Sequence, residues 1–541
     1  MSKNNRALSA RHFKNKTLFE QLSETAKDTG TLSPEQIRSL SEKSLISQAS
    51  LLGASSFYDF LNDANQGKKA YVCHGTCCKL SGKQQSAYST LAEQYSENEI
   101  GEVACLGRCY RAGAYWQGEQ TYDVEHGLAQ KENRDTIPFY NSASQPIFIE
   151  EIAELEQLYQ IASLDTKKII DELTRSKLRG RGGAGFPFAD KLIACVNASD
   201  EYDSQKYVVC NGDEGDPGAF SDRYLLEAQP HNVLAGMFAA GVAMGAKTGF
   251  LYIRAEYPIS VSRMANAIEA FEKTSAYRKT DFHFHIIRGA GSYICGEETA
   301  LLNSIEGLRP EVRTRPPYPA QEGLFGKPTL ISNVETFAAL PWILQHGGDA
   351  FTNIGTTKST GNKLVSLDYG FNTPGVHEVD MGTPLEHIVN QLGSGFRHSV
   401  KALQIGGPLG CVVPLDNISR LSLDYESFTE QGFELGHAGI VTIPESYPMI
   451  EFLRHLFSYM ADESCGKCLP CRLGTAKGHT LLVEASNDNP IDQKLFNDLL
   501  DTLELGSLCG LGSGLPLPVR NILNYFSDEL TDYFLQGKGD E

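Results

Sequence analysis

Long apolar runs are missing from this chain, and so is any block rich in lysine and arginine. No run of about 18 or more apolar residues occurs in the sequence, so it offers no candidate for a membrane-spanning helix. The start, MSKNNRALSARHFKNKTLFE, has no apolar core of signal-peptide length, and we therefore expect a cytoplasmic chain without direct membrane insertion. The net charge is −19, and without a basic face for phosphate contacts nucleic-acid binding is a poor expectation.

The thirteen cysteines carry more information than any other residue type in the chain. An odd count in a chain without an export signal argues against a disulfide framework. Eight of the thirteen fall into two sets of four with tight internal spacing. One inorganic centre has to be reached by several thiolates at once, so this grouping favours metal or iron–sulfur ligation.

The length of 541 residues and the hydrophobic pattern divide the chain into several units. Strand candidates at 206–210, 248–254 and 283–287 alternate with helical patterns in one long region, and the last part of the chain is helical in pattern. We expect an N-terminal helical segment (1–68), a compact α/β unit (69–125), a polar linker (126–150), a large α/β domain (151–350), a small β-rich domain (358–445) and a helical bundle (446–541).

Four C-terminal cysteines form the strongest single motif. Cys465, Cys468 and Cys471 have C-x2-C-x2-C spacing, and Cys509 is a distant fourth. Three closely spaced thiolates can surround a cubane that the fourth completes, so the spacing favours a [4Fe–4S] cluster. Zinc also accepts four thiolates, but two separated pairs are its usual spacing. Zinc and a chance grouping of buried cysteines remain the alternatives.

Three motifs rich in glycine and polar side chains lie in the large α/β domain. Residues 180–187 (GRGGAGFP) match G-x-G-x-x-G, and such glycines let a backbone approach a phosphate closely, although a helical pattern rather than a strand precedes them. Residues 211–218 (NGDEGDPG) and 291–299 (GSYICGEET) each follow a strand candidate, where α/β proteins place ligands. Each motif alone is also compatible with a surface loop, a solvated turn or a helix cap. Together they indicate a nucleotide-binding domain.

Six motifs occur in a fixed order: GRGGAGFP, CNGDEGDPGAF, GSYICGEETALLNSIEG, RPPYPA, KPTLISNVET and ESCGKCLPCRLGT. In this order they resemble the NADH-binding flavoprotein subunit of respiratory complex I and its relatives in soluble NAD-linked hydrogenases and formate dehydrogenases. The resemblance covers about residues 150–541. Gly215 and Asp216 depart from the Ser and Glu usual in complex I, and Ser332 departs from the usual Asn. The Gly-Asp form resembles the beta (diaphorase) subunits of the soluble enzymes more closely.

The resemblance implies an α/β fold with four parts: a thioredoxin-like N-terminal domain, a Rossmann-like FMN- and NAD-binding domain, a ubiquitin-like β-grasp domain and a C-terminal helical bundle. It implies that FMN is held by Gly180, Arg181, Gly182, Gly183, Gly185, Lys191, Asn211, Asp213, Glu214, Ser332, Asn333 and Thr336. It implies that NAD stacks on Phe186 and Tyr318, with Asp216, Tyr293, Gly296, Glu297, Glu298 and Arg315 around it. Flat aromatic rings suit a flat nucleotide and carboxylates suit ribose hydroxyls, so the residue chemistry agrees.

The N-terminal cysteines form a second set. Cys73, Cys78, Cys105 and Cys109 give C-x4-C and C-x3-C, and each pair follows a strand candidate, so two loops can hold one [2Fe–2S] cluster between them. The segment from residue 32 to residue 60 also resembles the small thioredoxin-like subunit of complex I. Cys77 competes with Cys78 for the same position. A vestigial domain without a cluster is the alternative.

The mechanism that the resemblance implies is hydride transfer between NAD and FMN without a catalytic side chain, and then single-electron transfer through the [4Fe–4S] cluster to a partner. No molybdenum, nickel or formate motif is present in the sequence, so a large catalytic subunit has to convert the primary substrate. We expect first the molybdenum or tungsten subunit of an NAD-dependent formate dehydrogenase, then a nickel–iron hydrogenase, then complex I. A small iron–sulfur subunit is a further expected partner. A non-catalytic electron-transfer scaffold is the alternative from a different class.

Overall fold

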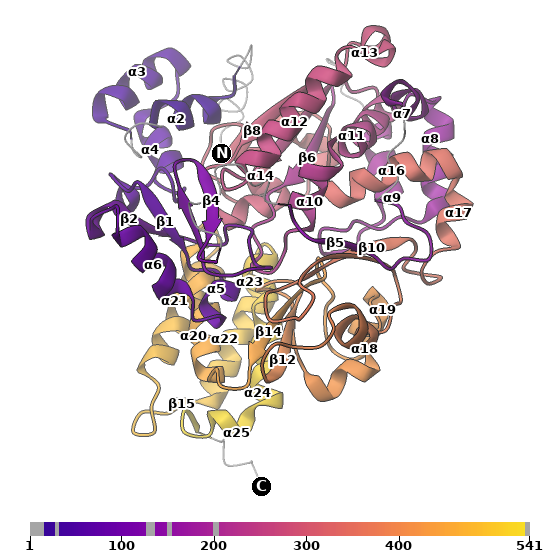
Figure 1. Ribbon diagram of the computed structural model, residues 1–541. Helices are drawn as coiled ribbons and strands as arrows, with labels where there is room; N and C mark the ends of the chain where they lie inside the picture. Colours follow the sequence, from indigo (N-terminus) through magenta and orange to yellow (C-terminus); the bar gives the residue numbers. More distant parts are fainter. Residues whose placement is uncertain (1–15, 27–31, 126–135, 149–153, 199–204, 536–541) are drawn as a thin grey trace.

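The computed structural model describes residues 16–26, 32–125, 136–148, 154–198 and 205–535 (Figure 1). It has the mixed α/β architecture expected from the sequence. Parts of the expected segments lie outside the described residues, namely 1–15 and 27–31 of the N-terminal segment, 126–135 and 149–150 of the linker, 151–153 and 199–204 of the large domain, and 536–541 of the bundle. None of the helices in the described part of the chain combines the length and hydropathy that a transmembrane helix requires.

A small mixed sheet in the order β2-β1-β3-β4 forms the N-terminal α/β unit. Its strands are β1 (Ala70–Cys73), β2 (Ile100–Val103), β3 (Ala114–Gln117) and β4 (Gln120–Asp123). Because β1 and β2 run parallel, the segments after their carboxyl ends meet at one edge of the sheet. The segment after β1 contains α5 (Thr76–Leu80) and α6 (Gln84–Ala92).

The N-terminal helical segment packs against the large domain (Figure 1). It consists of α2 (Leu18–Ala26), α3 (Pro34–Ser44) and α4 (Gln48–Ser55). Ser33 caps α3 by accepting a hydrogen bond from the backbone N–H of Gln36, which is the capping box that starts many helices. Phe19 and Tyr58 lie in the same buried cluster as Tyr252 of the large domain.

A four-stranded parallel sheet in the order β8-β7-β6-β9 forms the centre of the large domain. Its strands are β6 (Tyr207–Gly212), β7 (Thr248–Ile253), β8 (His283–Arg288) and β9 (Thr329–Asn333). Helices α11 (Pro230–Met244) and α16 (Val334–His346) pack together, and α14 (Glu298–Ile305) joins a separate buried cluster. Side chains along β6 alternate between these two clusters, as a strand covered on both faces requires.

The order in which the chain adds strands to the sheet reverses at β6. The strands β7 and β8 extend from one side of β6, whereas β9 lies on its other side. Asn211 at the end of β6 is in register with Asn333 at the end of β9. Such a reversal opens a crevice beyond the carboxyl ends of the strands, and open α/β sheets bind their ligands there.

The β-rich domain is a six-stranded mixed sheet in the order β13-β12-β14-β10-β11-β5. Its own strands are β10 (Asn362–Leu367), β11 (Gly375–Asp380), β12 (Val400–Ile405), β13 (Cys411–Pro414) and β14 (Gly439–Pro444). The last strand, β14, lies between β10 and β12, parallel to the first and antiparallel to the second. This central position of the last strand fits the ubiquitin-like β-grasp arrangement.

The sixth strand comes from residues expected to be only a linker. Within 126–150, β5 (Phe139–Asn141) pairs in parallel with β11. Phe139 stacks on Tyr224 of the large domain, with 4.4 Å between the ring centroids. This aromatic contact gives the segment a fixed place, which its polar composition did not indicate.

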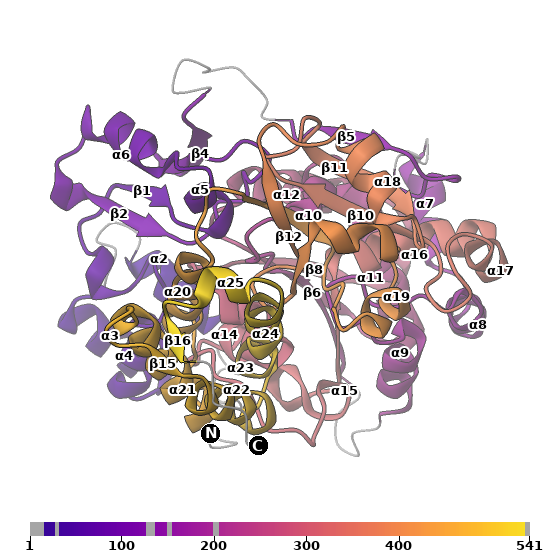
Figure 2. The same cartoon turned by 90° about the horizontal axis from the view of Figure 1, so that it is seen from below.

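The C-terminal region is a helical bundle. It contains α20 (Met449–Asp462), α21 (Leu469–Glu484), α22 (Gln493–Gly506), α23 (Gly510–Gly514) and α24 (Pro516–Tyr525). Figures 1 and 2 place the bundle beside both the N-terminal sheet and the β-grasp sheet. His455 of α20 is hydrogen-bonded to Thr76 of α5 at 3.1 Å, and Asn521 of α24 accepts from the backbone N–H of Val412.

Candidate functional site

Two pockets lie side by side at the carboxyl edge of the parallel sheet. The larger, which we call the central pocket, has a volume of about 420 Å³, and the smaller, which we call the outer pocket, has a volume of about 220 Å³. Both are lined by Gly182, Gly183, Ala184, Asn211, Gly296 and Asn333. The shared residues make the pockets continuous, so an elongated ligand can occupy both.

The expected nucleotide-binding residues divide between these pockets. The central pocket is lined by Arg181, Gly182, Gly183, Asn211, Asp213, Glu214, Asp216, Tyr293, Gly296, Glu297 and Asn333. The outer pocket is lined by Gly180, Gly182, Gly183, Gly185, Phe186, Lys191, Asn211, Gly296, Glu298, Ser332, Asn333 and Thr336. Arg315 and Tyr318 line neither pocket. Arg315 is tied to the outer pocket through Glu298, because its Nη1 lies 2.8 Å from Oε1 of that residue.

Two of the expected aromatic residues have exposed rings. Phe186 is 54% exposed and Tyr318 is 55% exposed, unlike most large apolar side chains of the chain. Phe186 belongs to the wall of the outer pocket. A planar ring that is held open to solvent at a pocket wall offers a stacking surface for a planar ligand.

The glycine loop approaches its neighbours too closely for larger residues. A Cβ atom on Gly182 would lie 3.0 Å from the Cβ of Asn333, and one on Gly185 would lie 2.9 Å from the ring of Tyr425. Gly185 also has φ = +60°, in the left-handed region that favours glycine. The backbone of this loop is therefore bare where the two pockets meet, which allows close approach of a ligand phosphate.

Carboxyl groups dominate the wall of the central pocket. Burial raises the pKa of Asp213 well above its ordinary range, and Oδ2 of this residue has no hydrogen-bond partner among the described residues. Burial also raises the pKa of Glu214 to about 7, although hydrogen bonds from the backbone N–H groups of Asp222 and Arg223 oppose the shift. Burial and the neighbouring carboxylate of Glu214 raise the pKa of Asp222. This wall is rich in acceptors, and a flavin or nicotinamide N–H group can serve as their donor.

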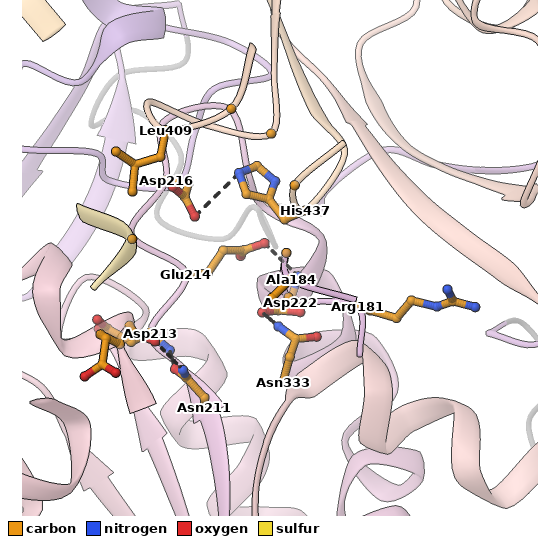
Figure 3. A pocket seen from close by; sticks show the side chains of 18 of the residues that line it. Arg181, Ala184, Asn211, Asp213, Glu214, Asp216, Asp222, Asn333, Leu409 and His437 are labelled. Atoms are coloured by element: carbon orange, nitrogen blue, oxygen red, sulfur yellow. Dashed lines mark hydrogen bonds and ion pairs between the residues drawn. The ribbon is translucent and has the colours of Figure 1, made fainter. Parts of the chain in front are cut away.

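Six polar residues of the central pocket were not expected from the sequence: Ser221, Asp222, Glu335, Lys363, Glu434 and His437. Asn333 donates to Oδ2 of Asp222 at 2.6 Å, as Figure 3 shows. Asp222 follows the acidic turn by a few positions, so a wider window around that turn would have included it. Lys363, Glu434 and His437 belong to the β-grasp domain, and no local sequence signal links that domain to the pocket.

His437 faces the pocket with a defined tautomer. Its Nδ1 accepts a hydrogen bond from the backbone N–H of Gly439 at 3.0 Å, so the neutral ring carries its proton on Nε2. Nε2 lies 3.5 Å from Oδ2 of Asp216, and Figure 3 shows the two side chains facing each other. Asp216 also accepts from the hydroxyl of Tyr293 at 2.7 Å. The β-grasp domain therefore supplies part of the pocket wall.

The four C-terminal cysteines surround one hollow, which Cys465, Cys468, Cys471 and Cys509 line together with Ile294 and Leu511. Ile294 and Leu511 also line the central pocket, so the thiol hollow is its immediate neighbour. Burial raises the pKa of Cys509 to about 12 and that of Cys471 to about 11. Metal coordination is therefore needed to displace these protons, as iron–sulfur ligation does.

The N-terminal cysteines also converge. All five thiols, those of Cys73, Cys77, Cys78, Cys105 and Cys109, are buried. The sulfur atoms of Cys105 and Cys109 are 3.6 Å apart. Cys73 is hydrogen-bonded to Cys78, whereas Cys77 is hydrogen-bonded to Cys109. The donor set suits a [2Fe–2S] cluster and offers it one thiol more than it needs.

We expect Cys78→Ser to remove the [2Fe–2S] EPR signal and about two irons per chain, and Cys77→Ser to leave both unchanged. The reason is that Cys78 pairs with Cys73 at C-x4-C spacing and lies in the same buried cluster as Cys73. Iron analysis and EPR of the reduced full-length variants provide the measurement. A normal signal in Cys78→Ser, together with its loss in Cys77→Ser, would reverse the assignment.

Three family descriptions match consecutive parts of the chain. Residues 5–129 match the thioredoxin-like [2Fe–2S] ferredoxin, residues 173–342 match the Nuo51 FMN-binding domain, and residues 451–533 match the iron–sulfur binding region of NADH-ubiquinone oxidoreductase F. The third match favours the [4Fe–4S] cluster over the zinc alternative. The first match favours a cluster-bearing N-terminal domain over a vestigial one.

Curated relatives extend over much of the chain. The NADP-reducing hydrogenase subunit HndC of Solidesulfovibrio fructosivorans is 38% identical over 69% of this chain and 77% of its own length. The F 2 polypeptide of the NADH-quinone oxidoreductase of Rhizobium meliloti is 38% identical over 67% of this chain and 87% of its own length. The NAD-reducing hydrogenase HoxS subunit alpha of Cupriavidus necator is 31% identical over 90% of this chain and 86% of its own length.

A solved structure supports the same grouping. A chain of an NAD⁺-reducing [NiFe]-hydrogenase in the air-oxidized state superposes with a TM-score of 0.85 at 25% identity, over 99% of this chain and 95% of that chain. This match covers nearly the whole chain, whereas the relative from Rhizobium meliloti is aligned over 67% of it. This protein therefore belongs to the family of NAD-linked electron-transfer subunits that combine an FMN-binding domain with [4Fe–4S] and [2Fe–2S] sites, together with the F-type subunits of NADH-quinone oxidoreductases and the corresponding subunits of NAD-reducing hydrogenases.

Proposed function

We propose that the two pockets hold FMN and NAD, that the two cysteine sets hold the clusters, and that the chain exchanges electrons with a partner subunit. The arrangement that supports this proposal is the contact between the central pocket and the thiol hollow through Ile294 and Leu511. A hydride acceptor in the pocket and a one-electron carrier in the hollow would be neighbours. Bound FMN supplies the exchange between hydride transfer and single-electron transfer.

The side chains of the pockets bind and orient rather than react. Asn211 donates to the carbonyl oxygen of Gly296 at 2.7 Å and so fixes two pocket walls against each other. Glu297 caps α14 by accepting from the backbone N–H groups of Thr299 and Ala300, both at 2.9 Å. These contacts hold the backbone of the pocket rigid around a planar ligand, which is the contribution of the protein when a cofactor performs the chemistry.

The partner that we propose first is the large subunit of a nickel–iron hydrogenase. Similarity to the HoxS subunit alpha over 90% of this chain, and to a chain of an NAD⁺-reducing [NiFe]-hydrogenase over 99% of it, supports this partner. The same comparisons give less direct support to the formate dehydrogenase subunit that we expect first from the sequence. Formate dehydrogenase remains the second candidate, because the Gly215–Asp216 form resembles the soluble enzymes as a group. Purification of the intact complex distinguishes the two: nickel and hydrogen-dependent NAD⁺ reduction support the first, and molybdenum or tungsten with formate-dependent reduction supports the second. A purified chain without bound flavin would contradict the whole proposal.

An apolar surface lies next to the [4Fe–4S] cysteines. Leu469, Leu473 and Leu505 are 60%, 59% and 86% exposed, and Leu508 is 42% exposed. Gly506 packs against Pro470, which brings the start of α21 next to the end of α22. Contiguous exposed apolar side chains mark interaction surfaces. Cys468 and Cys509 directly adjoin Leu469 and Leu508 in the sequence and are only partly buried. We therefore assign this surface to the iron–sulfur subunit that receives or delivers the electrons.

We expect Leu505→Glu to weaken assembly with that subunit by at least about tenfold in Kd, because a carboxylate would have to lose its water in an apolar contact. The [4Fe–4S] signal should persist, since the Leu505 side chain is 86% exposed and supports no core packing. Gel filtration and titration calorimetry of the reconstituted complex provide the measurement. Val483→Glu is the matched control and should assemble normally, because Val483 is 54% exposed and lies near the end of α21, whereas Cys471 lies near its start.

A further inference from the structure

The segment that follows β10 in the β-grasp domain reaches the cysteine set of the N-terminal unit. The backbone N–H of Tyr369 in this segment donates to the carbonyl oxygen of Cys109 at 2.9 Å. The ring of Tyr369 lies in the same buried cluster as Cys73 and Cys78, and all the other buried members of that cluster belong to the N-terminal unit. The β-grasp domain therefore supplies part of the wall around these thiols.

A buried carboxylate fixes the place of this segment. Asp368 accepts hydrogen bonds from the backbone N–H of Thr442 at 3.2 Å, from the hydroxyl of Thr442 at 3.1 Å and from the backbone N–H of Gly370 at 3.1 Å. Thr442 belongs to β14, which also packs against α5, the helix that carries two of the cysteines. A Cβ atom on Gly370 would lie 1.9 Å from Oγ1 of Thr442, so the close contact requires glycine. Tyr369 is therefore held on both sides along the chain.

The hydroxyl of Tyr369 is buried and has no hydrogen-bond partner within the described part of the chain. The residue as a whole is only 7% exposed. Burial raises the pKa of Tyr369, and the neighbouring negative charges of Asp368, Cys77 and Cys78 add to the shift, so the hydroxyl keeps its proton. A buried donor without an acceptor is unfavourable and rare. The unpaired hydroxyl beside the thiols therefore indicates an acceptor that the protein chain alone does not provide.

We propose that Tyr369 completes the [2Fe–2S] site by donating a hydrogen bond from its hydroxyl to a sulfur atom of the bound cluster or of a ligating thiolate, and that it thereby raises the reduction potential of the cluster. The inference rests on the proposed function, in which the N-terminal cysteines are the ligands. The negative charge on these sulfur atoms increases when the cluster accepts an electron, so a donor stabilises the reduced state more than the oxidised state. The β-grasp domain then has a second role besides lining the central pocket.

The test is an EPR-monitored redox titration of the full-length protein with FMN and both clusters. At the midpoint potential of the unmodified protein, we expect Tyr369→Phe to lower the ratio of reduced to oxidised [2Fe–2S] cluster by about fivefold, or ~41 mV for a one-electron couple. The change keeps the ring and removes only the hydroxyl, which bonds to none of the described residues, so the fold should persist. The iron content and the intensity of the fully reduced signal should stay unchanged.

Two further measurements report on the hydroxyl itself. In the reduced protein prepared in D₂O, pulsed EPR should detect deuterons coupled to the [2Fe–2S] cluster, and one of these couplings should be missing in Tyr369→Phe. Replacement of Tyr369 by 3-fluorotyrosine should change the midpoint in the opposite direction, because fluorine makes the phenol a stronger hydrogen-bond donor. This replacement adds little volume, and the sign of its shift decides the question if Tyr369→Phe does not fold.

Tyr115→Phe is the matched control. Tyr115 lies on β3 of the N-terminal sheet and is fully buried, and its hydroxyl also has no hydrogen-bond partner among the described residues. Its buried cluster contains no cysteine, so the loss of this hydroxyl should leave the midpoint unchanged. An unchanged midpoint in Tyr369→Phe, or an equal shift in both variants, would overturn the proposal. A full-length protein without any [2Fe–2S] EPR signal would instead contradict the cluster assignment on which the proposal rests.

Discussion

Cys468→Ser and Cys509→Ser are each expected to remove the [4Fe–4S] EPR signal and about four of the roughly six irons per chain, while FMN remains bound. A serine hydroxyl is a far poorer ligand for iron than a thiolate, so either change leaves the cluster with three good ligands. The fold should survive both changes. Cys468 is the N-cap residue of α21 and Cys509 is the N-cap residue of α23, and serine is a favoured residue at that position.

The two variants should separate the activities of the protein. Reduction of ferricyanide by NADH should persist, because an artificial acceptor does not need the cluster, whereas electron exchange with the natural partner subunit should stop. Iron analysis, EPR and both assays on one preparation give the measurement. Cys195→Ser, at a buried thiol outside both cysteine sets, controls for the loss of a sulfur atom and should retain all signals. Unchanged cluster EPR in both Cys468→Ser and Cys509→Ser would refute the assignment.

The centre of the fold and the position of the site followed from local sequence patterns. The strand candidates at 206–210, 248–254 and 283–287 are confirmed as β6, β7 and β8, because buried parallel strands consist of short apolar runs. Polar residues directly after such strands lie at the carboxyl edge of the sheet in any α/β fold. This is why the motifs at 211–218 and 291–299 meet in one pocket.

Local sequence patterns could not predict the contacts between domains. Lys363 faces the central pocket from a strand of another domain, and its ion pair with Glu335 is fully buried. Arg254 looks like an ordinary charged residue at the end of a strand, and only the packed structure brings it to Cys105. The strand β5 in the expected linker forms for the same reason, since its partner β11 lies more than 200 positions later in the chain. Periodicity describes one element at a time, whereas these contacts depend on how separate elements pack.

The preference for NAD over NADP depends on a charge arrangement at the outer pocket. Oε2 of Glu298 lies 3.1 Å from Nζ of Lys191, and its Oε1 lies 2.8 Å from Nη1 of Arg315. The carboxylate thus neutralises two cations and still offers oxygen atoms to a ribose hydroxyl. A 2′-phosphate at the same place would meet the carboxylate, and juxtaposed like charges in a partly dry site cost several kcal/mol. We therefore expect the unmodified protein to prefer NAD.

Glu298→Gln is expected to raise the catalytic efficiency with NADPH by at least about tenfold, or ~1.4 kcal/mol, and to lower that with NADH by less than this. The change keeps the shape of the side chain but removes its charge. Lys191 then loses its carboxylate partner, and among the described residues Arg315 keeps only Glu297, at 3.7 Å. An ammonium with a guanidinium is a favourable site for a phosphate. The preference for NAD should be lost, because the same substitution removes the repulsion of the 2′-phosphate and leaves cations that attract it.

The measurement is kcat/KM for NADH and NADPH with ferricyanide, which avoids any dependence on the partner subunit. Glu311→Gln serves as the matched control. Its carboxylate also has two cationic neighbours, Lys467 at 3.0 Å and Arg309 at 3.9 Å, but it lines neither the central nor the outer pocket. It should leave the ratio of the two efficiencies unchanged, since the loss of one negative charge elsewhere in a chain of net charge −19 is a small change in the overall field. Equal efficiencies for both cofactors in the unmodified protein, or an unchanged ratio in Glu298→Gln, would show that Glu298 does not select the cofactor.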